Sequence, residues 1–145
     1  LVLIDYTKPS TEKRFYILDL LQKKLLLSTY VAHGRGSGDN YAVAFSNRPG
    51  SYQSSLGFFR TGDTYMGKNG YSLFLDGLEK GINDKARERA IVVHGANYAD
   101  PAVLKGQQRL GRSLGCPALP PDISKQVIDT IKGGVLLYIY GLNKA

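Results

Sequence analysis

Short β-prone runs, each soon followed by glycine or polar turn-forming residues, recur along the whole of this 145-residue chain. The longest apolar stretch, GGVLLYIYGL at 133–142, is half the length of about 20 residues that a membrane-spanning helix needs. Seventeen glycines and ten tyrosines exceed average usage, which favours strands and turns over a helical bundle. We therefore expect one mainly β domain over residues 1–145, with no membrane span.

The pattern along the chain predicts two helices among the strands. A short helix is expected at 82–90, capped by Asn83 or Asp84, and a longer one at 121–132, with an apolar face and two glycines at its end. Residues 61–70 and 95–119 read as loop. Strands are expected at 1–6, 14–20, 24–31, within 41–46, and at 56–60, 71–75, 90–94 and 135–140, the last in the centre of the sheet.

The charge balance narrows the classes of partner. Nineteen Lys and Arg against twelve Asp and Glu give a formal net charge of +7, which suits nucleic acid, anionic lipid or an acidic polymer such as the bacterial cell wall. The basic residues are scattered, and no aromatic residues interleave with them as in RNA-binding proteins, so we expect no nucleic-acid partner. The single cysteine excludes an intrachain disulfide.

Two loop features fail as ligand sites. The glycine-rich segment HGRGSGDN at 33–40 runs into YAVAF rather than opening a helix, so it matches neither a dinucleotide fingerprint nor a P-loop. Two histidines and one cysteine lie too far apart along the chain for a structural zinc site. We expect no metal and no cofactor.

Cys116 in GRSLGCPAL and His94 in AIVVHGANY are the residues with catalytic potential. A thiol attacks as the thiolate, which a neighbouring imidazole promotes, and backbone amides around a Gly-Cys turn can stabilise an oxyanion. His94 ends an apolar strand and Gly115 permits a tight turn. The alternative is that both are ordinary buried residues, because free cysteine is often buried and a histidine at a strand end is often just hydrogen-bonded. As a pair, they should lie within hydrogen-bond reach, with Cys116 in a cleft where it packs against little.

IVVHGANY followed by GRSLGCPAL resembles the His-Gly and Ser-x-Gly-Cys signatures of the L,D-transpeptidase (YkuD-like) catalytic domain, in its murein L,D-transpeptidase branch. The segments LVLIDY, VAHGRGSG, FSNRPGSYQSSLGFFRTGDTY and GYSLFLDGLE extend the resemblance from residue 1 to residue 140. The resemblance implies a β-barrel or sandwich with the cysteine and histidine at one end of a cleft. It also implies cleavage of peptidoglycan stem peptides after the L-residue that precedes a terminal D-amino acid.

The resemblance also implies roles for individual residues. Cys116 would be the nucleophile and His94 the base, with the Gly95 carbonyl orienting the imidazole and Ser113 beside the nucleophile. The amides of residues Leu114, Gly115 and Cys116 would hold the oxyanion. The segment SSLGFF, with Ser55 and Gly57, would line the cleft, and His33 is a candidate for a supporting role, the alternative being an exposed loop histidine.

The chain departs from the family pattern at two positions. Leu114 stands where many relatives have histidine, and Ala118 where many have arginine or asparagine. A stem peptide carries carboxylates, which arginine binds through two parallel hydrogen bonds, so another arginine must serve. The candidates are Arg112, Arg35 and Arg60, and adjacency to the nucleophile favours Arg112.

The resemblance implies an exported protein of the bacterial cell envelope, and three readings of its function are open. The leading hypothesis is a cysteine transpeptidase of the periplasm or cell envelope that acts on stem peptides, monomeric and open to carbapenems. The second is an L,D-carboxypeptidase or crosslink hydrolase that uses the same pair, with water in place of the acceptor amine. The third is a non-catalytic cell-wall binding module, which would require a Cys116 unable to reach His94.

Overall fold

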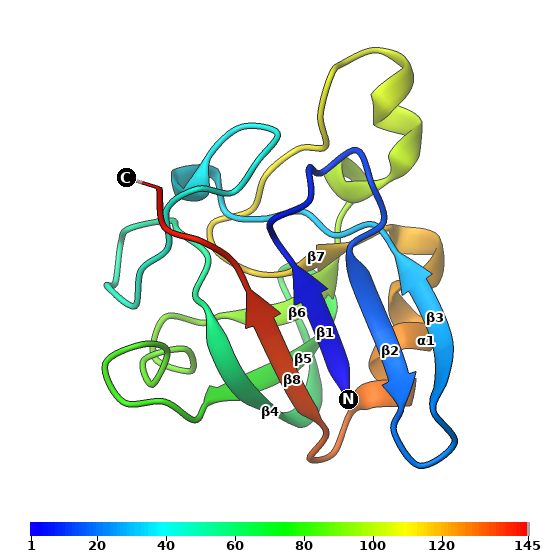
Figure 1. The fold of residues 1–145 in the computed structure, drawn as a ribbon, viewed down its shortest axis with the longest axis vertical. Helices are drawn as coiled ribbons and strands as arrows, with labels where there is room; N and C mark the ends of the chain where they lie inside the picture. Colours follow the sequence, from blue (N-terminus) through cyan, green and yellow to red (C-terminus); the bar gives the residue numbers. More distant parts are fainter. Residues whose placement is uncertain (145) are drawn as a thin grey trace.

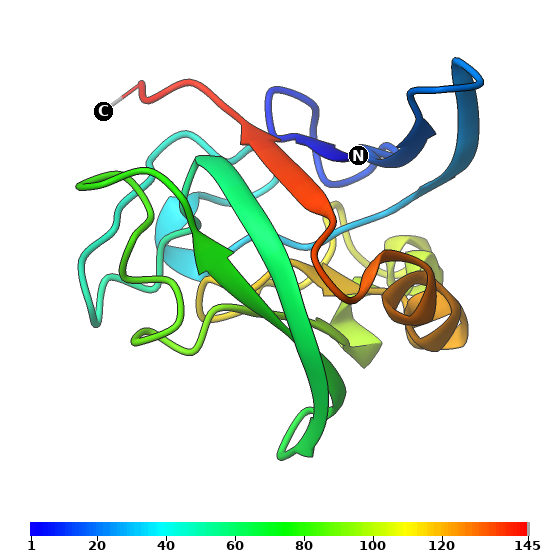
Figure 2. The ribbon, with the colours of Figure 1, turned by 90° about the horizontal axis from the view of Figure 1, so that it is seen from below.

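The computed structural model describes residues 1–144, and all of its named strands belong to one eight-stranded sheet. The sheet curls into a nearly closed barrel (Figures 1 and 2). Its order is β3-β2-β1-β8-β4-β5-β6-β7. The strands are β1 (Val2–Asp5), β2 (Phe15–Asp19), β3 (Lys24–Thr29), β4 (Gly57–Gly67), β5 (Gly70–Gly77), β6 (Val92–Gly95), β7 (Ala118–Leu119) and β8 (Leu136–Tyr140). The mainly β fold expected from the sequence is confirmed.

Strand β8 holds the two halves of the sheet together. It pairs in parallel with β1, where Val2 faces Leu137, and antiparallel with β4, where Gly57 faces Ile139. Alternate residues of β8 are buried, as expected for a strand with one face on the core. The prediction of a central strand at the end of the chain is confirmed.

Two predictions about loops and strands are wrong. Residues 61–67, expected to be loop, continue β4 and form a hairpin with β5, because Thr64, Tyr65 and Met66 suit a strand and Gly70 (φ 81°) closes the turn. The strand expected within 41–46 is absent. There the amides of Val43 and Ala44 both donate to the Ser37 carbonyl, which makes a loop.

Helix α1 (Pro121–Ile131) packs against the sheet beside β6 and confirms the longer predicted helix (Figure 1). Pro121 occupies the first turn, where a missing N–H costs nothing. Val127, Ile128 and Ile131 form the buried face. The packing of α1 fixes the position of β6, the strand that carries His94.

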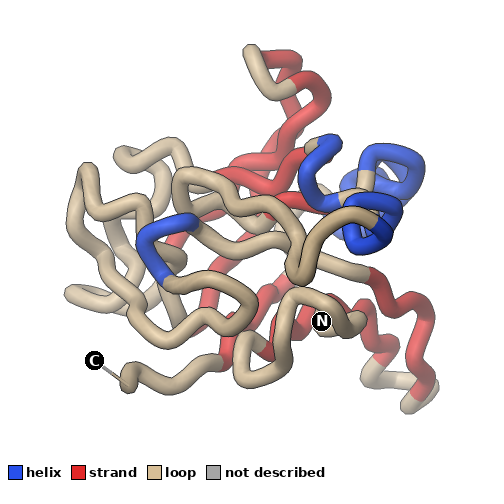
Figure 3. Tube along the Cα trace, turned by 90° about the horizontal axis from the view of Figure 1, so that it is seen from above, coloured by secondary structure: helices blue, strands red, loops and turns tan. Residues whose placement is uncertain are grey.

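The prediction of a short helix at 82–90 is wrong. This segment is a series of turns, and its Asn83 does not cap a helix. The Asn83 side chain is buried and donates to the carbonyls of Leu56 and Phe58 at 2.9 Å, while it accepts from the Glu79 amide. The side-chain amide of Asn83 is therefore used in tertiary hydrogen bonds and does not cap a helix. The other helical pieces are 3₁₀ turns, η1 (Arg35–Ser37), η2 (Asn97–Ala99) and η3 (Pro101–Lys105) (Figure 3).

Within residues 1–144, no helix has the length and apolar character that a membrane crossing requires.

Candidate active site

The turn at 113–116 presents the only cysteine of the chain. Gly115 has a φ of 123°, which a residue with a side chain rarely adopts, so the tight turn predicted from the sequence is present. The Ser113 hydroxyl donates to the Cys116 carbonyl at 2.6 Å and accepts from the Gly115 amide at 3.1 Å. Ser113 therefore holds the turn closed from within.

The Cys116 thiol is more enclosed than the sequence predicts. Its residue is 9% exposed, and the sulfur donates to the Ala90 carbonyl at 3.4 Å and accepts from the Val92 amide at 3.4 Å. Burial raises the pKa of the thiol, while the Val92 N–H and the Arg89 charge act in the opposite direction. The expectation that Cys116 packs against little is therefore wrong, because strand β6 covers it.

His94 lies in β6 and is 4% exposed. Its Nδ1 lies 2.9 Å from the Gly95 carbonyl, the contact that the family resemblance implies. With the Nδ1 proton donated there, Nε2 keeps its lone pair. Burial lowers the pKa of the imidazole, which favours its neutral form, the form that accepts a proton.

The backbone joins the two predicted catalytic residues. The His94 amide donates to the Pro117 carbonyl, and His94 faces Ala118 in the parallel pairing of β6 with β7. The side chains, however, are not hydrogen bonded to each other in the part of the chain that the structure describes. The thiol donates to the Ala90 carbonyl, so it must leave that bond before it can donate to the imidazole. A hydrogen bond between catalytic side chains often forms only when substrate binds.

The amides around the nucleophile are not equivalent. The sequence predicts the Gly115 amide as a donor to the oxyanion. In the structure this amide donates to the Ser113 hydroxyl instead. Across residues 1–144, no protein acceptor takes the amide hydrogens of Leu114 and Cys116. Of the three predicted amides, these two are therefore available to bind an incoming acceptor. Leu114 itself is 55% exposed, so its side chain lies at the surface.

His33 is buried rather than exposed, with 1% of its surface accessible. Its Nδ1 accepts from the guanidinium of the buried Arg14 at 2.8 Å, and its Nε2 lies 3.2 Å from the Gly38 carbonyl. Burial and the Arg14 charge lower the pKa of His33 to about 4. The His33 carbonyl accepts from the Ser113 amide, so this residue supports the nucleophile turn through its backbone.

The low pKa of His33 predicts a loss of stability in acid. The unfolded chain binds a proton near pH 6.5 and the folded chain near pH 4, so stability falls as the pH drops through this window. Between pH 7 and pH 5 we expect a loss of roughly 2 kcal/mol in the free energy of unfolding from this group. Urea denaturation at both pH values measures it. His33→Gln should flatten the dependence, and an unchanged slope in that variant would assign the effect to other groups.

The predicted arginines differ in their partners. Arg112 forms an ion pair with Asp39 at 3.0 Å, so part of its binding capacity is taken. Arg35 lies over the Tyr52 ring at 4.6 Å, and its backbone amide donates to the Ser113 carbonyl. Among residues 1–144, no carboxylate pairs with the Arg35 guanidinium. Arg35 is thus the freer cation beside the nucleophile turn.

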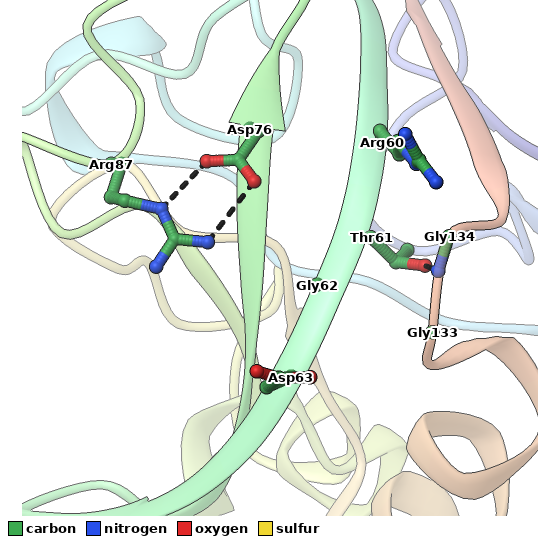
Figure 4. A pocket seen from close by; sticks show the side chains of 8 residues that line it. All are labelled: Arg60, Thr61, Gly62, Asp63, Asp76, Arg87, Gly133 and Gly134. Atoms are coloured by element: carbon green, nitrogen blue, oxygen red, sulfur yellow. Dashed lines mark hydrogen bonds and ion pairs between the residues drawn. The ribbon is translucent and has the colours of Figure 1, made fainter.

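The other residues expected to line the cleft have different surroundings. Ser55 is buried and its hydroxyl bonds to the Ser46 carbonyl and to Arg89. Gly57, also buried, has a φ of 97° and no room for a side chain beside Glu79. Arg60 lines a cavity of about 410 Å³ on β4, beside the Gly133–Gly134 turn (Figure 4). None of the residues that line this cavity belongs to the 113–116 turn.

Arg89 lies beside the nucleophile turn, and the sequence did not single it out. Its guanidinium donates to the carbonyls of Ser46 and Gln53 and to the hydroxyls of Ser51 and Ser55. These partners lie 34–43 residues earlier in the chain, so no local pattern identifies them. The one signal is position, because Arg89 stands just before the strand that carries His94.

Groups of three or more His, Cys, Asp or Glu side chains that could hold a metal ion are absent from residues 1–144.

A family model and several solved structures are similar to this chain. The family model of the L,D-transpeptidase catalytic domain matches residues 1–140. An L,D-transpeptidase from Mycobacterium smegmatis has a TM-score of 0.56 at 12% identity, covering 97% of this chain and 58% of that chain. Pgp2, the helical cell shape determining protein from Campylobacter jejuni, has a TM-score of 0.61 at 17% identity, with coverage of 99% and 48%.

A third similar structure is the LD transpeptidase LdtMt1 in complex with imipenem, with a TM-score of 0.55 at 13% identity and coverage of 96% and 57%. At these identities the likeness concerns the fold, and this chain spans about half the length of each of the three proteins. No curated protein is significantly similar to it. Because the family model matches nearly the whole sequence, this chain belongs to the L,D-transpeptidase catalytic domain family.

Proposed function

We propose that this domain is a peptidoglycan L,D-transpeptidase that acts on stem peptides through an acyl-enzyme on Cys116. The observation that carries the proposal is the turn at 113–116. There the sulfur of the only cysteine of the chain accepts from the Val92 amide of strand β6. The amides of Leu114 and Cys116 have no acceptor among residues 1–144. Membership of the family supplies the substrate class.

The proposed reaction has two steps. The Cys116 thiol turns toward His94, whose Nε2 takes its proton, and the sulfur attacks the carbonyl carbon of the L-residue. The amides of Leu114 and Cys116 stabilise the oxyanion, and the C–N bond breaks as the D-amino acid leaves with the proton from His94. An acceptor amine then attacks the thioester and gives its proton to His94. The C–S bond breaks as the new amide bond forms, and the released sulfur takes the proton back from His94.

Water in place of the acceptor amine would make the enzyme an L,D-carboxypeptidase or a crosslink hydrolase with the same residues. Because the substrate belongs to the cell wall, we propose that the domain works outside the cytoplasm, in the periplasm or cell envelope. A non-catalytic binding module would also have an enclosed Cys116, as β6 encloses it here. The reactivity of the Cys116 thiol distinguishes the enzyme from the binding module.

Incubation of the protein with a disaccharide tetrapeptide, with and without an amine acceptor, tests the proposal. Mass spectrometry should find the loss of the terminal D-alanine and a product joined to the amine. Tripeptide alone would assign the hydrolase activity. Intact tetrapeptide in every reaction, with a folded protein and an unreactive Cys116, would favour the binding module.

Arg35 is expected to bind a carboxylate of the donor peptide. Replacing it with lysine keeps the charge and removes the two-pronged geometry, and alanine removes both. We expect kcat/KM to fall in the order wild type, Arg35→Lys, Arg35→Ala, by roughly tenfold to a hundredfold for alanine. Alkylation of Cys116 by iodoacetamide should stay unchanged.

The matched control for Arg35 is Arg112→Ala, which removes a cation already paired with Asp39. It should cost less than Arg35→Ala. The reverse order of effects would return the anchoring role to Arg112, the residue that adjacency in sequence favours.

A further inference from the structure

Arg89 joins the start of β6 to the segment 46–55. Its Nη1 donates to the Ser46 carbonyl at 2.8 Å and to the Ser55 hydroxyl at 2.7 Å. Its Nη2 donates to the Gln53 carbonyl at 2.7 Å and to the Ser51 hydroxyl at 3.2 Å. The guanidinium is therefore fixed in one place by four bonds, although each partner is neutral.

The same guanidinium lies against the nucleophile turn. A Cβ built on Gly115 would lie 3.4 Å from Nη2 of Arg89 and 3.0 Å from the Gln53 carbonyl oxygen. Gly115 directly precedes Cys116. The segment 46–55 also lies against the chain at Gly34, because a Cβ on Gly34 would clash with the Tyr52 carbonyl oxygen and would lie 2.9 Å from the Gly115 Cα. Three segments thus meet at the turn, and Arg89 ties two of them together.

The charge of Arg89 has no carboxylate partner among residues 1–144. Arg87 and Arg112, by contrast, are paired with Asp76 and Asp39. A partly buried cation with neutral partners is costly unless an anion lies close to it. The anion that the proposed reaction creates is the Cys116 thiolate, and the charges of Arg89 and Cys116 stabilise each other.

Resting on the proposed function, we propose that Arg89 is a positioning residue that holds the segment 46–55 against the nucleophile turn and stabilises the Cys116 thiolate after its proton has moved to His94. Position 118, where many relatives have arginine or asparagine, is alanine in this chain. Ala118 is fully buried and lies in β7, so that position has no room for a charged side chain here.

The pH dependence of Cys116 alkylation by iodoacetamide tests this role, since the reagent needs the thiolate and no substrate. In Arg89→Gln the midpoint of the rate should rise by about one pH unit, with a roughly tenfold lower rate below it. Arg87→Gln is the matched control, because it removes the same charge two residues away, from an exposed pair with Asp76. The titratable groups around the thiol are Arg89, Lys68, His94, Tyr6 and Tyr98.

The variant Arg89→Lys separates the effect of the positive charge from the effect of the four hydrogen bonds to the segment 46–55. Lysine keeps the positive charge but cannot reach four acceptors, so its midpoint should stay within about 0.3 pH units of the wild type while kcat/KM for a stem peptide falls. An unshifted midpoint in a folded Arg89→Gln protein would overturn the proposal. So would a shift of a full unit in Arg89→Lys, which decides the matter even where the glutamine variant fails to fold.

The design also distinguishes this inference from the proposed function. A Cys116 that reacts with iodoacetamide at the same pH midpoint in every Arg89 variant, in a protein that still processes tetrapeptide, refutes only the role of Arg89. A protein that shows the expected midpoints but leaves tetrapeptide intact refutes the function and keeps the electrostatic pairing.

Discussion

Cys116→Ala should abolish the processing of tetrapeptide, with a loss of at least about a thousandfold in turnover. The proposed acyl-enzyme has no other thiol on which to form, because the chain contains one cysteine. Alanine keeps the Cβ but loses the bonds of the sulfur to Ala90 and Val92. We therefore also expect a stability loss on the order of 1 kcal/mol, measured by urea denaturation.

Cys116→Ser is the control for this experiment. A serine hydroxyl keeps a donor and an acceptor in the same place but is a far weaker nucleophile than a thiol at neutral pH. Turnover should be lost while the protein stays folded. Retained turnover in both variants would show that the wrong nucleophile has been chosen.

Imipenem should acylate Cys116 once, and His94→Ala should slow the reaction by about a hundredfold or more. The sulfur attacks the strained lactam carbonyl, the ring C–N bond breaks, and the ring nitrogen takes the proton from His94. Nothing leaves in this step, so the intact mass should rise by the mass of one whole inhibitor. Time-resolved mass spectrometry gives the rate.

The carbapenem experiment has two controls. Cys116→Ala should give no adduct, and an adduct there would point to another nucleophile. His94→Gln cannot act as a base, so it should be about as slow as His94→Ala. If both His94 variants acylate at the wild-type rate, the base lies elsewhere, and the contact of His94 with Gly95 has only a structural role.

Local patterns predicted the elements whose residues determine their own conformation. Helix α1 has a proline at its first turn, one apolar face and glycines at its end, and β8 is a continuous apolar run. The turn before Cys116 needed only a glycine with a positive φ. In each case, the information lies within about fifteen residues of sequence.

The errors arose where tertiary contacts decide the outcome. Asn83 resembles a helix cap in sequence, yet its amide bonds to Leu56 and Phe58 on another segment. The enclosure of Cys116 depends on β6, and the setting of Arg89 depends on carbonyls of the segment 46–55. His33 is buried because Arg14, nineteen residues earlier, binds its ring. Such pairings over long separations leave no periodic signal in the sequence.

The position of β8 between β1 and β4 has a consequence for the order in which the protein acquires its structure. Residues 136–140 follow the seven other strands of the sheet in chain order, and they hydrogen bond to both neighbours. Until they emerge, β1 and β4 each present an open edge, and the sheet exists as two separate pieces. The barrel thus stays incomplete until residue 140 has emerged. A nascent chain stalled before residue 136 should remain open to protease, whereas a chain extended well beyond residue 140 can add β8 and close the sheet.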